Sequence, residues 1–386
     1  MQQKTAGPEN AVLVSLDFGE PDYAESREEL RLLAETAGVH AVAIVEGKRQ
    51  HPDAALFAGS GKVQEIAELV EQMEIPLVIF NHDLSPAQMR NLTAKLNTRV
   101  IDRTMLILDI FAQRAQSHEG KVQVELAQLK YLATRLVWQG VDMGQQKFAV
   151  GARGPGETKL ELDRRKLDKR VHLLKERLEK LKRQRVLQRR SRNRANVFSV
   201  SVVGYTNAGK STLFNRLTRA NAYVADQLFA TLDTTSRRMF TGGQGHPPAP
   251  SLRGEIVVSD TVGFIRHLPH SLVAAFRSTL EETIQADLLL HVVDINNPNR
   301  DDQIAEVNKV LSEIGAENIP QVLVFNKIDL SGVPPDVERD EYGRIAAVRL
   351  SAKTAAGVDE LRAALAEASN AEPADAPVQE WHPLNN

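Results

Sequence analysis

The eight residues from Gly204 to Ser211, Gly-Tyr-Thr-Asn-Ala-Gly-Lys-Ser, have the composition and spacing of a phosphate-binding loop. They follow the apolar stretch Val197 to Val203 and open a helix-forming segment, which is the context that the motif requires. A chance glycine turn is the alternative. Lys210 is expected to bridge the β and γ phosphates, and Ser211 to offer its hydroxyl to magnesium. The residues assigned to phosphate binding are Gly204, Tyr205, Thr206, Asn207, Ala208, Gly209, Lys210, Ser211 and Thr212.

Two later motifs can read the base. The Asp329 carboxylate, after the apolar stretch QVLVF, can accept hydrogen bonds from guanine N1 and N2. Adenine has no such donor pair at that edge, and a buried carboxylate without a partner is costly. Ser351-Ala352-Lys353 suits backbone contact with guanine O6. The motifs therefore predict GTP rather than ATP, bound by Asn326, Lys327, Ile328, Asp329, Ser351, Ala352 and Lys353.

A carboxylate and a threonine between these motifs complete a predicted magnesium site. Asp260 ends the apolar stretch EIVVS and is placed to hold the metal through water, while the Gly263 N–H can meet the γ-phosphate. Thr231 is the candidate switch threonine that joins the metal only with GTP; an ordinary loop threonine is the alternative. The metal set is thus Ser211, Thr231 and Asp260, and the catalytic set Lys210, Thr231 and Gly263. The neighbouring nucleotide-binding residues are Phe229, Ala230, Leu232, Asp233, Thr261 and Val262.

Phe264 occupies the position after Gly263 where many GTPases carry a water-orienting glutamine. A phenyl ring neither donates nor accepts a hydrogen bond, so another group must position the water. Because a completed site is worth about 10³ to 10⁵ in rate, we expect slow basal turnover that a partner stimulates.

Length and composition indicate several globular domains. The chain has 386 residues, 42% of them apolar, and no cysteine, so a thiolate metal site and disulfides are excluded. It has neither an apolar run long enough for a membrane span nor the pattern of a signal peptide at its N-terminus. We expect a cytoplasmic monomer, with peripheral attachment to a membrane left open. Between Lys159 and Arg194, 16 Lys and Arg oppose 5 Asp and Glu, so a local net charge of +11 stands within a total of −2.

Secondary-structure patterns along the chain predict an α/β domain, a helical segment and a second α/β domain, in that order. Strand and helix signals alternate from Val12 to Ile101, which predicts a small parallel α/β domain over residues 1–117. Apolar residues spaced four and three apart then predict two antiparallel helices, joined by a glycine-bearing loop, over residues 118–195. Renewed alternation predicts a doubly wound P-loop domain over residues 196–370, and residues 371–386 read as a disordered tail.

Residues Gly59-Ser60-Gly61-Lys62 resemble half a phosphate loop, but the first glycine is missing at the required spacing. A helix start is the favoured interpretation over a second nucleotide site.

The motifs GYTNAGKSTLFNRLT, DTVGFIRHLPHSLVAAFRSTLEE and NKIDL, with RGPGETKLELDRR and the segment VIDRTMLILDIFAQRAQSHEGKVQVELAQLKYLATRL, resemble the HflX family of ribosome-associated GTPases. The resemblance covers about residues 12–365. It implies binding to the large ribosomal subunit and its RNA, and GTP-dependent splitting of stalled or stress-arrested ribosomes. An RNA-remodelling ATPase activity is also associated with the family.

Three positions depart from the family pattern. Thr234 replaces a proline after the switch segment, and residues 147–151 keep a single glycine where the family loop is glycine-rich. The chain after Leu365 is short, so we expect little room for a folded C-terminal domain.

The basic segment gives independent reason to expect an RNA partner. Its charges would make a sequence-independent, salt-sensitive contact with phosphates, although a solvated helix face is the alternative. Phe148 suits stacking on a base or a small packing role. The candidate RNA contacts are Arg153, Arg183, Arg185, Arg189 and Arg190.

Two other functions stay open. One is an RNA-dependent ATPase or helicase, which would need adenine binding that Asp329 does not favour. The other is a GTP-switched binding module in which hydrolysis only resets the switch.

Overall fold

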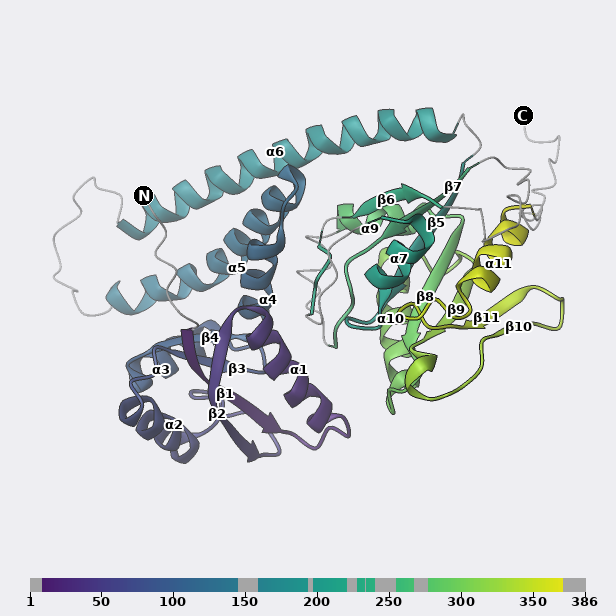
Figure 1. Cartoon of the computed structure of the whole chain (residues 1–386). Coiled ribbons are helices and arrows are strands. Elements are labelled where there is room, and N and C mark those ends of the chain that lie inside the picture. The colour runs from purple at the N-terminus through teal and green to yellow at the C-terminus, as the bar shows by residue number, and fades with distance from the viewer. Residues whose placement is uncertain are drawn as a thin grey trace, which may run out of the picture.

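The computed structural model describes residues 9–144, 159–193, 197–220, 228–232, 234–239, 255–266 and 277–370. For 136–144, 159–163, 182, 184–193 and 277–279 it describes the backbone without the side chains. The predicted α/β, helical and α/β order is confirmed (Figure 1). The Gly/Pro-rich stretch 241–252, the loop with Phe148, and residues 371–386 lie outside the described residues.

The N-terminal domain is a parallel sheet of order β2-β1-β3-β4 with helices on both faces. The central strands β1 and β3 are buried along most of their length because both faces of the sheet are covered, as is usual for parallel sheets. One face packs on α1 and α4, and the other on α2 and α3. The elements are β1 (Glu9–Asp17), α1 (Tyr23–Thr36), β2 (Val39–Lys48), α2 (Ser60–Gln72), β3 (Leu77–Phe80), α3 (Pro86–Leu96), β4 (Arg99–Asp102) and α4 (Arg103–Arg114).

The segment Gly59 to Lys62 is a helix start, as favoured from sequence. Gly59 precedes α2 with a φ of 78°, and Lys62 forms an ion pair with Glu65 at 2.6 Å. The first turn of α2 is thus tied to its own helix.

The chain connects its two α/β domains through an antiparallel pair of long helices (Figure 1). They are α5 (His118–Gly144) and α6 (Lys159–Asn193). The predicted apolar seam is present, because Leu174 is fully buried against Val122 and Leu126. Arg170 forms an ion pair with Glu125 at 2.6 Å beside this seam. No helix in the described part of the chain is long and apolar enough to cross a membrane.

The C-terminal domain has a sheet of order β10-β11-β9-β8-β5-β7-β6, whose five central strands are parallel. The two edge strands, β6 and β10, run antiparallel to their neighbours. A strand before the stretch 241–252 was predicted from sequence, whereas β10 was not, because it is short and polar. Its elements are β5 (Phe198–Gly204), α7 (Lys210–Thr218), β6 (Thr235–Arg238), β7 (Ile256–Asp260), α9 (Arg277–Ile284), β8 (Leu288–Asp294), α10 (Arg300–Ile314), β9 (Gln321–Asn326), the 3-10 turn η1 (Ile328–Leu330), β10 (Asp336–Arg339), β11 (Ile345–Arg349) and α11 (Val358–Asn370).

The central strands β5, β7, β9 and β11 all end toward the same edge of this sheet, where the predicted motifs follow them. Ligands of doubly wound sheets bind at this edge.

Candidate nucleotide site

The phosphate loop connects the end of β5 to the start of α7 in a tight turn. Lys210 is buried, and its Nζ donates a 2.6 Å hydrogen bond to the Tyr205 carbonyl across the loop. Burial lowers the pKa of Lys210 to about 8. The loop therefore encloses a positive charge at the helix N-terminus, where backbone N–H groups favour an anion.

Gly209 is required where the loop enters α7. Its φ is +96°, and a Cβ atom there would lie 2.2 Å from Nδ2 of Asn326. That amide donates to the Ala208 carbonyl at 2.8 Å, so it braces the loop from the end of β9. A side chain at position 209 would displace this brace.

Three oxygen-bearing side chains converge beside the loop. Ser211 Oγ lies 2.7 Å from both Thr231 Oγ1 and Asp260 Oδ2, and Thr231 Oγ1 lies 2.9 Å from Asp260 Oδ2. Asp260 is 1% exposed, and burial raises its pKa. Its Oδ1 is buried and accepts no hydrogen bond from any residue that the structure describes. This set of hydroxyl and carboxylate oxygens is the kind that holds magnesium together with phosphates.

The strand end after Asp260 is joined to the phosphate loop by the backbone. Phe264 N donates to the Gly204 carbonyl at 3.1 Å, and Thr206 N donates to the Phe264 carbonyl at 2.7 Å. A Cβ atom on Gly263 would lie 2.9 Å from Lys210 Nζ, so the glycine leaves room beside the lysine. The Phe264 side chain is 3% exposed and packs in an apolar core.

The two motifs predicted to read the base lie together beside the loop, because Asn326 also contacts Ala208. Oδ1 of Asn326 accepts from the Ala352 N–H at 2.9 Å, and Oδ1 of Asp329 accepts from the Ser351 hydroxyl at 2.5 Å. Arg216 on α7 donates to the Ala352 and Lys353 carbonyls at 2.9 and 2.6 Å. Sequence reasoning missed Arg216, because an arginine in a helix carries no signal of a partner so distant in the chain.

The remaining predicted residues differ in exposure. Thr206, Phe229, Leu232, Thr261, Val262 and Ile328 are buried, and Asn207 and Lys353 are exposed. Thr212, Ala230 and Lys327 are half-buried, and Lys327 Nζ pairs with Asp294 at 2.8 Å. Asp233 and Arg153 lie outside the described residues, as do the side chains of Arg185, Arg189 and Arg190, whereas Arg183 is exposed on α6.

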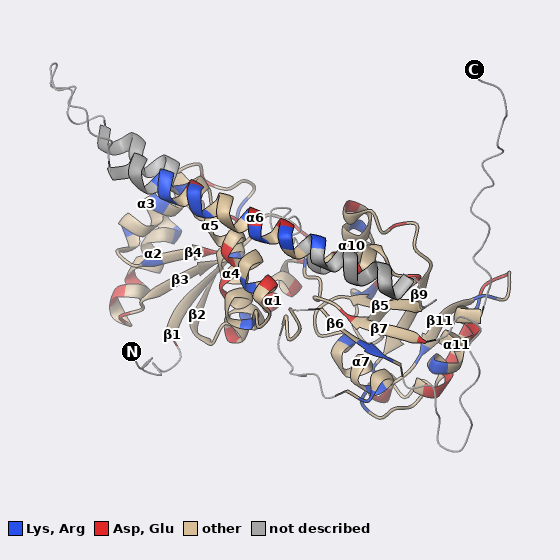
Figure 2. Cartoon of the chain, turned by 90° about the horizontal axis from the view of Figure 1, so that it is seen from above, with Lys and Arg blue, Asp and Glu red and all other residues tan. Residues whose placement is uncertain are grey.

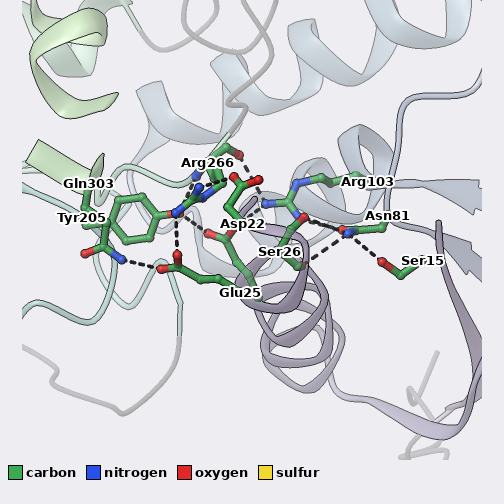
Figure 3. A network of polar contacts seen from close by, with 10 residues as sticks. Ser15, Asp22, Glu25, Ser26, Asn81, Arg103, Tyr205, Arg266 and Gln303 are labelled. Atoms are coloured by element: carbon green, nitrogen blue, oxygen red, sulfur yellow. Dashed lines mark hydrogen bonds and ion pairs between the residues drawn. The ribbon is translucent and has the colours of Figure 1, made fainter. Parts of the chain in front are cut away.

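A buried polar network joins the N-terminal domain to this site (Figure 3). The Tyr205 hydroxyl donates to Glu29 at 2.7 Å and accepts from the Arg266 N–H at 2.6 Å. Glu29 also pairs with Arg103 at 2.7 Å, and both side chains are 6% exposed. The Arg266 guanidinium contacts Asp22 and, at 2.5 Å, Glu25. No short sequence pattern could have indicated these contacts between domains.

Three family models together match most of the chain. Residues 24–112 match the N-terminal domain of GTP-binding GTPases, residues 114–192 match their middle region, and residues 199–327 match the 50S ribosome-binding GTPases.

The chain is similar to curated proteins named GTPase HflX. It is 52% identical to that of Escherichia coli over 360 residues, covering 93% of this chain and 82% of the relative. It is 47% identical to that of Caldanaerobacter subterraneus over 366 residues, covering 95% and 82%. Among solved structures, the GDP complex of SsGBP is 26% identical, with a TM-score of 0.50 and coverage of 94% of this chain and 98% of that chain.

Proposed function

Since the chain belongs to the HflX family of GTPases, we propose that it binds the large ribosomal subunit and uses GTP to split stalled or stress-arrested ribosomes. The observation that carries this proposal is the match to the 50S ribosome-binding GTPases, which covers residues 199–327 and thus the phosphate loop. The chain is a GTPase. The proposal adds the large ribosomal subunit as its partner and ribosome splitting as the process that GTP drives.

We propose that the GTP phosphates lie on the loop from Gly204 to Ser211, with Lys210 between the β and γ phosphates. Magnesium fits beside them, because Asp260 has a buried oxygen without a partner among the described residues, next to two hydroxyls. Ser211 and Thr231 would hold the ion directly and Asp260 through water. The bound ion would neutralise charge on the phosphate oxygens. Among described residues, no cluster of three or more His, Cys, Asp or Glu offers a competing metal site.

The guanine base is proposed to lie between Asp329 and the backbone of Ala352. The Asp329 side chain is exposed at the sheet edge, and the Ser351 hydroxyl fixes one of its oxygens. The carboxylate is thereby oriented before the nucleotide arrives. An amide or hydroxyl at this position has a single acceptor oxygen, so it could not pair the two N–H donors of guanine with two separate oxygens as a carboxylate does.

Hydrolysis needs a water molecule that no side chain at position 264 can orient. Phe264 is apolar, buried and held by its backbone to the phosphate loop. We propose that the ribosome completes the site, so that free protein turns over slowly and large subunits accelerate it. The 10³- to 10⁵-fold effect of a completed GTPase site sets roughly the scale of this stimulation.

Helix α6 is the proposed RNA-binding surface. Lys and Arg positions recur along its described length (Figure 2). Those with described side chains are exposed, as expected for contact with phosphates. They are Arg164, Arg165, Lys166, Lys169, Arg170, Lys175, Arg177, Lys180 and Arg183.

The test combines GTP turnover, with and without isolated large subunits, and light scattering of intact ribosomes. We expect large subunits to stimulate turnover, and GTP to cause splitting. Lys210→Ala and Ser211→Ala should abolish splitting, whereas Lys309→Ala, a lysine exposed on α10, should leave it normal. Splitting by the Lys210 or Ser211 variant at limiting GTP would exclude the nucleotide as the driver.

A non-hydrolysable GTP analogue then separates two modes of action. Splitting with the analogue would make nucleotide-gated binding the working step, with hydrolysis as the reset. Stimulation of ATP turnover by RNA, in preference to GTP, would instead favour the ATPase alternative.

A further inference from the structure

The switch segment with Thr231 is inserted into the core of the N-terminal domain. Leu228, Phe229 and Leu232 are 4%, 2% and 2% exposed, and they share one apolar core with α1 and α4. The Phe229 ring meets that of Phe111 on α4 edge to face, with centroids 4.7 Å apart and an interplanar angle of 81°. The segment is therefore packed against another domain on both sides of Thr231.

A polar contact fixes the same segment at its start. The Leu228 N–H donates a 3.2 Å hydrogen bond to Oγ1 of Thr36, at the end of α1. Phe229 has a φ of 54°, in the left-handed region that bulky side chains seldom adopt. Packing of its ring in the N-terminal domain can maintain that conformation.

The anchored residues are close neighbours of Thr231 in the chain. Consecutive Cα atoms are only about 3.8 Å apart, so fixing Phe229 and Leu232 restricts where Thr231 can go. In this conformation the Thr231 hydroxyl lies 2.7 Å from Ser211 Oγ and 2.9 Å from Asp260 Oδ2. It thus points to the proposed magnesium position.

We propose that Phe111 and Thr36 are positioning residues for Thr231. By holding Phe229 and Leu228, they keep the Thr231 hydroxyl beside Ser211 and Asp260. The inference rests on the proposed role of Thr231 as a metal ligand in the GTP state. Because binding couplings are reciprocal, GTP and the docked switch segment favour each other, whereas GDP, which leaves Thr231 unused, has no such coupling.

The polar network around Tyr205 is a separate connection between the domains. It joins the phosphate loop and Arg266 to Glu29 and Glu25, and none of the hydrogen bonds given above for it involves Phe111 or Thr36. A change at Phe111 therefore removes packing around the switch segment and none of these hydrogen bonds.

The experiment compares Phe111→Leu with wild type for binding of a fluorescent non-hydrolysable GTP analogue and of fluorescent GDP. Removal of the Phe111 ring should weaken analogue binding by about 3- to 10-fold and raise the magnesium concentration it requires. GDP affinity should change by less than about 2-fold, because Thr231 is a ligand only in the GTP state. Phe229→Leu, made on the GTPase side, should give the same selective loss.

Phe80→Leu is the matched control. Phe80 is a fully buried phenylalanine on the opposite face of the N-terminal sheet, where its ring meets Phe57. The substitution removes the same atoms without touching the switch segment, so both nucleotides should bind as in wild type. An equal selective loss in Phe80→Leu would overturn the proposal in favour of general loosening of the domain.

Thr231→Ala distinguishes the role of Thr231 as a metal ligand from the positioning role of Phe111 and Thr36. If it binds the analogue and GDP as wild type does, the assignment of Thr231 fails, and the inference fails with it. If it loses analogue binding selectively while Phe111→Leu and Phe229→Leu do not, only the positioning role is wrong. Should Phe111→Leu fail to fold by circular dichroism, Phe229→Leu decides the outcome alone.

Discussion

The hydroxyl of Tyr205, in the phosphate loop, donates a 2.7 Å hydrogen bond to Oε1 of Glu29, which precedes it by 176 residues. The same hydroxyl accepts from the Arg266 N–H at 2.6 Å. Burial raises the pKa of Tyr205 further above its ordinary value, which already keeps the hydroxyl protonated at neutral pH. One side chain of the nucleotide site thus joins the N-terminal domain to the segment after β7.

Tyr205→Phe should lower stability while sparing the nucleotide site. Oε1 of Glu29 and the Arg266 N–H would each lose their hydrogen bond to Tyr205 in a buried place, at a cost of about 1 to 3 kcal/mol. GDP affinity should stay within about 3-fold, because the loop binds phosphate through backbone and Lys210. Urea unfolding and GDP titration measure the two effects. Tyr342→Phe, on an exposed ring, is the control, and equal stability of the two variants would refute the prediction.

Asp329→Asn should shift base preference from GTP to XTP. The amide replaces an acceptor by a donor that matches the xanthine carbonyl, so GTP affinity should fall by at least about 10-fold and XTP affinity should rise. Competition binding with both nucleotides measures the ratio. Asp359→Asn, on an exposed carboxylate paired with Arg362, should leave the ratio unchanged. If Asp329→Asn keeps full GTP affinity and gains none for XTP, Asp329 does not recognise the base.

Neutralising the end of α6 should weaken binding to large subunits and flatten its salt dependence. The slope should fall by about 0.7 to 0.9 for each phosphate that the helix no longer neutralises, while GTP turnover without ribosomes stays the same. Pelleting with large subunits across a salt series gives the slope. An unchanged slope would contradict RNA binding by this end of α6 and favour the alternative of a solvated helix face. The variant carries Gln at Arg183, Arg185, Arg189 and Arg190, and its control carries Gln at the exposed residues Lys48, Lys95, Arg300 and Lys309.

The GTPase domain should lose stability as the pH falls into the mildly acidic range, because buried His291 resists protonation in the folded state. His291 is 1% exposed on β8, and burial, with a smaller effect of Lys210, lowers its pKa to about 4. The unfolded chain takes up this proton near pH 6.5 and the folded chain only near 4, so stability is full above 6.5 and falls as pH drops toward 4. Between pH 7.5 and 5 the loss should be about 2 kcal/mol.

Urea unfolding at the two pH values tests this linkage. His291→Asn should be less stable than wild type at pH 7.5 but should lose less on acidification. His51→Asn, at an exposed histidine, should keep the wild-type pH dependence. If His291→Asn also keeps the wild-type pH dependence of stability, a group other than His291 causes the loss of stability in acid.

The order of elements and the motifs of the candidate site could be predicted from the sequence alone. Apolar periodicity follows directly from which face each strand or helix buries, so the parallel strands and the helical pair could be predicted. The loop around Lys210 and the motif with Asp329 could also be recognised, because their spacing is fixed by a single turn at the end of one strand. The polar edge strand β10 carries no comparable pattern, since it lies at the margin of the sheet.

The distant residues that support this site became apparent only in the folded chain. Phe229 was predicted to lie near the nucleotide, but its burial against Phe111 depends on how two domains dock. The same holds for Tyr205 and Glu29, whose pairing joins positions far apart in the chain. Side-chain contacts of this kind depend on the relative placement of whole elements. Local periodicity reports only the near neighbours of each residue, so it carries no information on that placement.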